Sequence, residues 1–405
     1  MKKLLIIFVS IIVYIYVCNI TLMPSNVIIF QGEELNFRTV VGLNIRRARQ
    51  ADSKTIQASN KMQCSNTYSS AGSYELNLDL FGTIPVKEIN VNVIERTKVI
   101  PCGDLIGVKM YTQGAYVVGM SEIEGYKPYE GTDIKEGDTI VEINKSKIFN
   151  TNDLVRLVNA SNGSEIEVKY VRADETKTTT MKPAKNSSNE YKLGLWVRDA
   201  AAGVGTLTFI EPKTNGFAAL GHGIVDSDTG GIFNIANGQL VGSELMSIKK
   251  GKKNNPGEIR GMVNSAEPIG DIYNNTNFGV FGKVTNTEIQ KGEGRKEYDV
   301  ALRSEIKEGE AEILCELEKG VKNSYKIKIE KIYTSNNYDN KSMLIKVTDE
   351  RLIEKTGGIV QGMSGSPIIQ NGKFVGAVTN VLVSDPTTGY AIFGDLMIKQ
   401  MRGVE

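Results

Sequence analysis

Histidine is almost missing from this sequence: His222 is the single one in 405 residues. Histidine is the one side chain whose ordinary pKa, about 6.5, lies in the working range of most enzymes. Any chemistry that needs an imidazole near neutral pH must therefore use His222. A metal site built from several histidines and a phosphotransfer scheme with two histidines are both excluded.

Cysteine is also scarce, with only Cys18, Cys64, Cys102 and Cys315. No two of them have the C-x-x-C spacing, which argues against a zinc ribbon. Cys18 lies in an apolar N-terminal run, so an odd number remains downstream, and this is no disulfide framework. The sequence therefore predicts mostly free thiols.

The chain has no excess of either charge: 48 Lys and Arg face 47 Asp and Glu, for a formal net charge of +1. Nucleic-acid binders usually carry a basic excess, so the balance argues against that class. With 40% hydrophobic and 23% charged residues the composition is that of a globular protein. Forty-one glycines against only ten prolines suit a turn-rich, mainly β protein.

What the sequence does contain begins at its N-terminus, where Lys2 and Lys3 precede an apolar run from Leu4 to Met23. A helix of about 20 residues is about 30 Å long, the thickness of a bilayer's hydrocarbon core. We therefore expect a transmembrane anchor over residues 1–23, with the lysines in the cytoplasm and the rest of the chain outside. A cleaved signal peptide is the alternative, but no small-x-small cleavage site follows the run.

Residues 24–99 are predicted to form a small β domain or spacer. Apolar and polar residues alternate over Tyr74–Leu80 and again over Val91–Ile94, as they do in half-buried strands. This segment shows no pattern that indicates chemistry.

Residues 100–183 have a different pattern, with a strand expected at Tyr116–Met120, a Gly137-Asp138 turn, a helix at Asn152–Ala160 and a strand at Ile166–Arg172. This order is similar to that of a PDZ domain of the bacterial, protease-associated kind. Such a domain binds a peptide as an added strand and receives its terminal carboxylate on a loop of the pattern x-apolar-Gly-apolar. We assign that loop to the residues Leu105, Ile106, Gly107 and Val108. An ordinary strand-turn-strand unit without a ligand is the alternative.

Residues 184–192 are polar and predict a linker, after which residues 193–405 contain short apolar segments divided by Gly, Asn and Asp turns. The segments expected as strands are Val204–Ile210, Phe278–Val284, Tyr325–Ile332 and Met343–Val347. Such spacing is typical of a β-barrel or a β-sandwich.

The most specific pattern of the chain surrounds Ser364, in the run Gly362–Pro367 (Gly-Met-Ser-Gly-Ser-Pro). Asn371-Gly372 follows between two apolar segments and predicts a β-hairpin. Glycines beside Ser364 would let a substrate carbonyl approach the backbone, where the N–H groups of Gly362 and Ser364 could converge on the developing oxyanion. The run resembles the nucleophile segment of chymotrypsin-like serine peptidases. Ser366 is the second candidate for the nucleophile, and a purely structural turn is the alternative.

A serine nucleophile needs a base, and His222 precedes Ser364 in the order found in chymotrypsin-like enzymes. Gly221 and Gly223 place His222 on a turn, which makes a buried structural histidine a weaker alternative. A Ser-Lys dyad is a further option, and it would leave His222 dispensable.

The third member of a triad would be a carboxylate that orients the imidazole. Six aspartates lie between the two residues: Asp226, Asp228, Asp271, Asp299, Asp339 and Asp349. Asp349 follows the strand Met343–Val347, but it or Thr348 could equally cap a short helix over residues 350–356. Local sequence does not decide between these two roles. Asp226 and Asp228 only faintly suggest a calcium loop, and we expect no metal or other cofactor.

Together, the apolar N-terminus, the PDZ pattern, the run Phe217–Gly223 and the run Thr356–Pro367 resemble the stage IV sporulation protein B family. These are PDZ-containing serine peptidases of endospore-forming bacteria. By position, His222, Asp349 and Ser364 match the family's triad. The resemblance implies a mainly β chain with a chymotrypsin-like double β-barrel peptidase domain, preceded by the small β domain and the PDZ domain.

The resemblance also implies a role in signalling between compartments. Such a peptidase is made in the forespore, is exported across its inner membrane and acts in the space between forespore and mother cell. There it releases itself by cleaving its own N-terminal region and cuts a membrane-bound regulator, so that an intramembrane metalloprotease activates a late mother-cell sigma factor. We therefore predict a serine endopeptidase. The alternative is a non-catalytic PDZ adaptor that binds membrane-protein partners.

Overall fold

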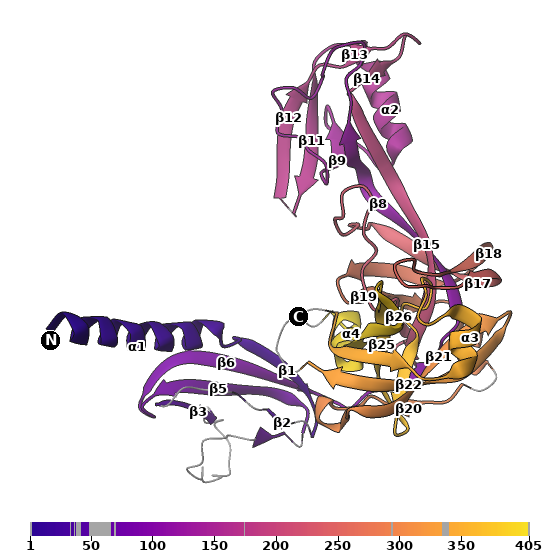
Figure 1. Ribbon diagram of the computed structural model, residues 1–405. Helices are drawn as coiled ribbons and strands as arrows, with labels where there is room; N and C mark the ends of the chain where they lie inside the picture. Colours follow the sequence, from indigo (N-terminus) through magenta and orange to yellow (C-terminus); the bar gives the residue numbers. More distant parts are fainter. Residues whose placement is uncertain are drawn as a thin grey trace. The chain divides into compact units, whose positions relative to one another are not determined.

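The computed structural model describes residues 2–403 except 33, 36, 38–41, 48–65, 69, 174, 293–294 and 334–339. Cys64 and Asp339, both considered above, lie outside the described residues. The chain divides into two compact units, Met1–Thr97 and Lys98–Glu405. Figure 1 shows the labelled helices and strands, coloured from the N-terminus to the C-terminus.

The first unit consists of one helix and short strands. Its elements are α1 (Lys2–Leu22), β1 (Asn26–Phe30), β2 (Glu34–Leu35), β3 (Leu43–Arg47), β4 (Asn66–Thr67), β5 (Gly72–Leu80) and β6 (Ile84–Ile94). Four strands form a sheet in the order β1-β6-β5-β3, in which only the β1–β6 pair is parallel. Leu76, Leu78, Ile89 and Val91 are fully buried on one face. The alternation predicted for these strands is confirmed.

Helix α1 forms from the N-terminal apolar run, but no helix in the described part of the chain is long and apolar enough to cross a membrane. The structure does not support the transmembrane anchor predicted over residues 1–23. Its last residue, Met23, is buried in the core of the β-sheet, and the Lys87 ammonium donates to the Met23 carbonyl.

Six strands of the second unit close into a ring by successive pairing. They are β8 (Leu105–Met120), β15 (Leu195–Glu211), β16 (Gly216–Ala219), β17 (Asn237–Lys249), β18 (Glu258–Thr276) and β19 (Gly279–Val284). The pairs run β8–β17, β17–β18, β18–β19, β19–β16, β16–β15 and β15–β8, which returns to the first strand. The ring encloses an apolar core that includes Ile106, Leu207, Phe217 and Leu240. We call these strands the strand ring.

The strand ring takes one strand from the segment that the sequence assigned to the PDZ domain. The first half of β8 pairs with β15 and β17 in the ring, and its second half continues into the PDZ sheet (Figure 1). Strand β15 follows the same course in the opposite direction. Short β7 (Lys98–Pro101) pairs with β15 and with β20 (Tyr298–Asp299). The PDZ unit is therefore inserted between two strands of the ring and does not simply precede a separate peptidase domain.

The PDZ unit contains the second half of β8, the first half of β15 and a helix. Its other elements are β9 (Thr139–Ile143), β10 (Ser146–Lys147), α2 (Thr151–Ala160), β11 (Ile166–Arg172), β12 (Glu175–Met181), β13 (Ala184–Lys185) and β14 (Tyr191–Lys192). Asn150 caps α2 by accepting from the Asp153 N–H, and Leu154 and Val158 are the buried residues of the helix. The segment 184–192, predicted as a linker, instead forms the β13–β14 pair, and the Tyr191 N–H donates to the Asn159 side chain at the end of α2.

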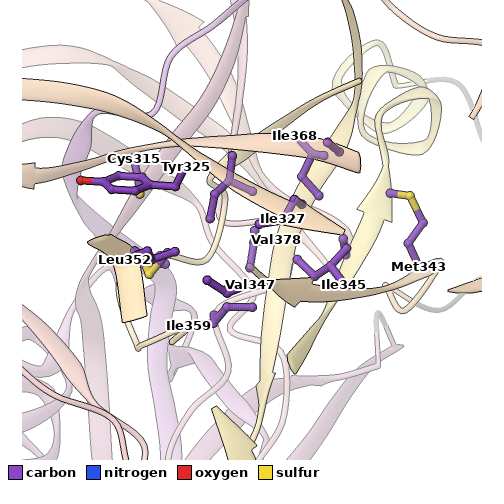
Figure 2. Packing of buried hydrophobic residues seen from close by; sticks show 14 of the residues in the cluster. Cys315, Tyr325, Ile327, Met343, Ile345, Val347, Leu352, Ile359, Ile368 and Val378 are labelled. Carbon is purple, nitrogen blue, oxygen red and sulfur yellow. The ribbon is translucent and has the colours of Figure 1, made fainter. Parts of the chain in front are cut away.

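The C-terminal part of the second unit is a closed β-barrel in the order β21-β22-β23-β26-β25-β24. Its elements are β21 (Gly309–Glu318), β22 (Val321–Ile332), β23 (Met343–Val347), α3 (Glu350–Thr356), β24 (Pro367–Gln370), β25 (Lys373–Leu382), β26 (Asp385–Phe393) and α4 (Gly394–Met401). Short 3₁₀ helices, η1 (Thr287–Lys291) and η2 (Arg303–Glu305), precede it. Figure 2 shows the barrel core, in which Cys315, Ile327, Ile345 and Ile368 meet.

Two local predictions in this part are confirmed. Strand β23 has the predicted bounds, and Asn371-Gly372 joins β24 to β25. Asn371 and Gly372 have φ of 50° and 74°, the left-handed pair that a type I′ hairpin requires. Cys18, Cys102 and Cys315 are free thiols, as predicted.

Candidate active site

Ser364 lies on a turn between α3 and β24, at the junction of the strand ring and the barrel. Gly362 and Gly365 on either side of it have φ of 98° and 94°, which only glycine adopts without strain. Ser364 is half-buried, and its hydroxyl donates to the Thr379 carbonyl over 2.7 Å. The turn therefore has the backbone that the glycine pattern predicted.

Gly365 is fixed by a second constraint that the sequence does not reveal. A Cβ atom at this position would lie 2.2 Å from the Thr206 carbonyl oxygen and 2.5 Å from the Leu220 nitrogen. Both of these backbones belong to the strand-ring side, so the glycine allows the ring to pack directly against the nucleophile turn.

His222 follows β16 on a bend formed by Leu220 and Gly221, both at φ of 70°. Its Nδ1 lies 2.9 Å from the Gly223 carbonyl oxygen. A carbonyl only accepts hydrogen bonds, so Nδ1 carries the hydrogen and the Nε2 lone pair is left available. This is the tautomer that a general base needs, because Nε2 must accept the serine proton.

The structure brings the His222 loop and the Ser364 turn to the same place, on two sides of Thr379. A Cβ atom at Gly221 would lie 3.1 Å from the Thr379 methyl group, and the Thr379 carbonyl accepts from the Ser364 hydroxyl. In the described part of the chain no hydrogen bond joins His222 to Ser364. A nucleophilic role for Ser364 would require its hydroxyl to turn away from Thr379 and toward Nε2, and catalytic hydrogen bonds are often long or poorly aligned in enzymes without substrate.

The Asp349 carboxylate binds groups at the start of α3 and in β22, away from His222. It caps α3 by accepting from the Arg351 N–H at 3.0 Å, and it also accepts from the Lys326 N–H at 3.1 Å. The Arg351 guanidinium forms an ion pair with it at 2.8 Å. The hydrogen bond from Arg351 is the main cause that lowers the pKa of Asp349 to about 2. The helix-capping role that the sequence left open is the one the structure shows.

Asp349 and Ser364 lie at opposite ends of β23. The Thr379 hydroxyl donates to the Asn340 carbonyl, before β23 begins, whereas Asp349 lies beyond its last residue. The strand between them spans four residue steps, or about 14 Å. No hydrogen bond joins Asp349 to His222 among the described residues. The structure therefore does not assemble the predicted triad, because the carboxylate is held at the far end of the barrel.

The two predicted oxyanion donors are available. Neither the Gly362 N–H nor the Ser364 N–H donates to an acceptor in the part of the chain that the structure describes. Their carbonyls, in contrast, are both engaged: Gly362 accepts from the Thr206 hydroxyl at 2.8 Å and Ser364 from the Thr206 N–H at 3.0 Å. Two free donors beside a half-buried hydroxyl can stabilise negative charge on a substrate oxygen.

The other sequence candidates are separated from this place or engaged. Ser366 is fully buried, so its hydroxyl is out of reach of a substrate. Asp226 and Asp228 form ion pairs with Arg198 at 2.7 Å and 2.6 Å. Asp271 and Asp299 lie within β18 and β20.

Asn275 is a site residue that the sequence analysis missed. Its side-chain oxygen accepts from the Ile224 N–H at 2.8 Å, and its amide donates to the Ile224 carbonyl at 2.8 Å and the Phe233 carbonyl at 2.9 Å. These bonds fix the segment that directly follows His222. An asparagine at the end of a long strand carries no local signal for such a role.

The four residues predicted to bind a peptide carboxylate, Leu105–Val108, do not form a loop. They lie in the ring half of β8, where β15 pairs with all four residues and β17 pairs with Ile106–Val108 along the other edge, while the Leu105 N–H donates to the Glu316 carboxylate. All four are buried. That prediction is wrong because the backbone N–H groups of a strand paired on both edges are already used.

The same x-apolar-Gly-apolar pattern occurs again at Lys192-Leu193-Gly194-Leu195, within the PDZ unit. Gly194 has φ of 69°, and the N–H groups of Leu193 and Gly194 donate to no acceptor among the described residues. Leu195–Arg198 pair with β8 along one edge only, and α2 contacts β15 beside them. The repeated pattern was visible in the sequence, but only strand pairing shows which copy keeps unpaired N–H groups among the described residues.

A cavity of about 310 Å³ lies next to α4 and is lined by residues that include Glu211, Tyr273, Phe281 and Arg402. It contains none of the predicted site residues, so it is not the cleft that would serve Ser364.

The comparisons with known proteins agree with the sequence resemblance. Residues 189–398, slightly more than half of the chain, match the family described as SpoIVB peptidase S55, and residues 104–182 match the PDZ domain family. A search of curated proteins gave no match.

Solved structures show weak similarity. The PDZ domain of the SdrC-like protein from Listeria monocytogenes is 16% identical, with 21% of this chain and 87% of that chain covered and a TM-score of 0.19. The Rv3671c protease from M. tuberculosis in its active form is 13% identical, with 63% and 87% covered and a TM-score of 0.28. Its inactive form is 13% identical, with 50% and 84% covered and a TM-score of 0.28.

The match over more than half of the chain places the Ser364 turn and the His222 loop within one serine peptidase family model. The PDZ match covers the unit inserted between β8 and β15. The chain belongs to the SpoIVB peptidase S55 family and carries a PDZ domain.

Proposed function

We propose that this protein is a serine endopeptidase in which Ser364 is the nucleophile and His222 the general base. The observation that carries the proposal is the meeting of two segments at Thr379: a glycine-flanked serine with two free N–H groups, and a histidine in the base tautomer. On this proposal the strand ring and the closed barrel correspond to the two barrels of a chymotrypsin-like peptidase, with the site at their junction.

The proposed reaction has two halves. The Ser364 oxygen attacks the scissile carbonyl carbon while Nε2 of His222 takes its proton, and the N–H groups of Gly362 and Ser364 stabilise the oxyanion. His222 then gives the proton to the leaving amine, and the C–N bond breaks to leave an acyl-enzyme. Water, deprotonated by His222, hydrolyses the ester and restores the Ser364 hydroxyl.

On this proposal the Gly223 carbonyl takes the orienting role on Nδ1 that the family resemblance implied for Asp349. Its oxygen accepts the Nδ1 hydrogen, and Asn275 holds the following residues in place. A role for Asp349 beside His222 would first require the carboxylate to leave Arg351 and the end of α3.

The PDZ unit would bind peptides as a strand added to Leu195–Arg198, with the terminal carboxylate on the N–H groups of Leu193 and Gly194. Its partners would be protein segments, including the enzyme's own N-terminal region. Membership of the S55 family further supports a signalling role: self-cleavage, followed by cleavage of a membrane-bound regulator between forespore and mother cell. That cut would release an intramembrane metalloprotease to activate a late sigma factor.

Ser364→Ala tests the proposal. The N-terminus of the mature protein in sporulating cells should be shifted by self-cleavage in the wild type and remain unprocessed in Ser364→Ala, with the fold intact by circular dichroism. His222→Ala should give the same result. Processing that persists in Ser364→Ala would contradict the mechanism, and processing that persists only in His222→Ala would indicate a Ser-Lys dyad.

The alternative, a PDZ adaptor without catalysis, makes the opposite prediction for a covalent probe. An alkyl fluorophosphonate should label the wild-type protein on Ser364. A folded wild-type protein that takes up no label would favour the adaptor.

A further inference from the structure

Among the described residues on the strand-ring side, Thr206 is the one that bonds to both the Ser364 turn and the segment leading to His222. It lies in β15 and is buried, with 2% of its surface exposed. Its N–H donates to the Ser364 carbonyl at 3.0 Å, and its hydroxyl donates to the Gly362 carbonyl at 2.8 Å. Its own carbonyl accepts from the Leu220 N–H at 3.2 Å, two residues before His222.

These contacts fix the peptide group that matters for the oxyanion. The Ser364 N–H belongs to the Met363–Ser364 peptide group, which lies between the two carbonyl groups that Thr206 holds. Thr206 anchors both flanking peptide groups, and the Met363 carbonyl itself accepts from the Ser366 N–H at 2.9 Å, so the peptide group between them has little freedom to rotate. Thr206 also approaches Gly365 so closely that no side chain fits there, which holds the turn against β15.

We propose that Thr206 is a positioning residue that aligns the Ser364 N–H as an oxyanion donor and keeps the turn in register with the His222 loop. The proposal rests on the proposed peptidase function. Thr206 does not touch the substrate in this assignment. It acts through its hydroxyl on the Gly362 carbonyl, because its two backbone contacts persist whatever side chain is present.

The hydroxyl can be removed with little change of shape by Thr206→Val, and Thr206→Ser keeps it. The full chain would be treated with an alkyl fluorophosphonate, whose phosphonyl oxygen occupies the oxyanion position as the Ser364–phosphorus bond forms and fluoride leaves. The inactivation rate at saturation, kinact, and the half-saturating concentration, KI, are then measured separately. Loss of an oxyanion donor reduces the rate of serine peptidases by about 10²–10³-fold.

Since misalignment is milder than removal, we expect Thr206→Val to lower kinact by about 10- to 100-fold with KI within about 2-fold of wild type. Thr206→Ser should keep kinact within about 3-fold, and Thr206→Ala replaces Thr206→Val if the latter does not fold. A purely structural role would lower the urea midpoint and leave kinact of the folded protein unchanged.

Ser364→Ala separates the two hypotheses. The positioning role is overturned if kinact of Thr206→Val equals that of wild type, or if Thr206→Ser loses as much kinact as Thr206→Val. In either case the peptidase proposal still stands as long as Ser364→Ala takes up no label. Labelling that persists in Ser364→Ala overturns the peptidase proposal itself.

Discussion

Replacing Asp349 by asparagine separates a catalytic from a structural role for this carboxylate. Loss of the acid in a serine-peptidase triad costs about 10⁴-fold in kcat. In the structure Asp349 instead caps α3 and binds Arg351. We therefore expect Asp349→Asn to keep the rate of fluorophosphonate labelling within about 3-fold of wild type, because asparagine caps a helix as well as aspartate does.

The stability cost of the same substitution follows from the ion pair. A pKa lowered from 3.8 to about 2 corresponds to at most about 2.4 kcal/mol. The Arg351 side chain is 66% exposed, and screening by water reduces the contribution to about 1 kcal/mol. Urea unfolding at pH 7 should show this loss.

The pH dependence has a definite sign. The folded-state pKa of Asp349 lies below the unfolded value, so its contribution is present above about pH 4 and disappears as the pH falls toward 2. The difference in unfolding free energy between wild type and Asp349→Asn should shrink over that range. A loss of labelling by 10³-fold or more, in a variant that remains folded, would refute the structural assignment and restore the predicted triad.

Two further substitutions test how the site is held. Gly365→Ala would bring a Cβ atom to 2.2 Å from the Thr206 carbonyl oxygen, so it should lower the unfolding free energy by about 3 kcal/mol or more and abolish labelling. The control Gly372→Ala is also at positive φ but has open space around it, so it should lower the unfolding free energy by only about 1 kcal/mol and retain labelling. Equal effects of the two on urea unfolding would contradict the packing argument. Asn275→Ala removes three hydrogen bonds from the segment after His222 and should lower the labelling rate about 10-fold, while exposed Asn274→Ala serves as the control and should leave it unchanged. An Asn275→Ala variant that labels like wild type would show that the His222 loop does not depend on this side chain.

Much of the fold could be read from local patterns. Strand β23, the Asn371-Gly372 hairpin and helix α2 follow from alternation, turn chemistry and helical periodicity, all of which act between near neighbours. Leu105–Val108 shows where this approach fails. Its pattern equals that of Lys192–Leu195, and only the pairing of β8 with β15 and β17 uses the backbone of one copy, whereas the Leu193 and Gly194 N–H groups of the other donate to no acceptor among the described residues.

The candidate site also has a part that sequence patterns indicated and a part that only the tertiary structure decided. The sequence by itself singled out the proposed base and nucleophile, because His222 is the single histidine of the chain and the glycines around Ser364 impose a backbone that few other turns need. The partners of these residues were decided by tertiary structure. Asp349 faces Arg351 at the far end of β23, and Thr206, Gly223 and Asn275 hold the two segments at the junction. Thr206 and Gly362 are 156 residues apart in the sequence, and Asn275 and Ile224 are 51 apart. Hydrogen bonds over such separations depend on how the strands pack, and no local pattern encodes that packing.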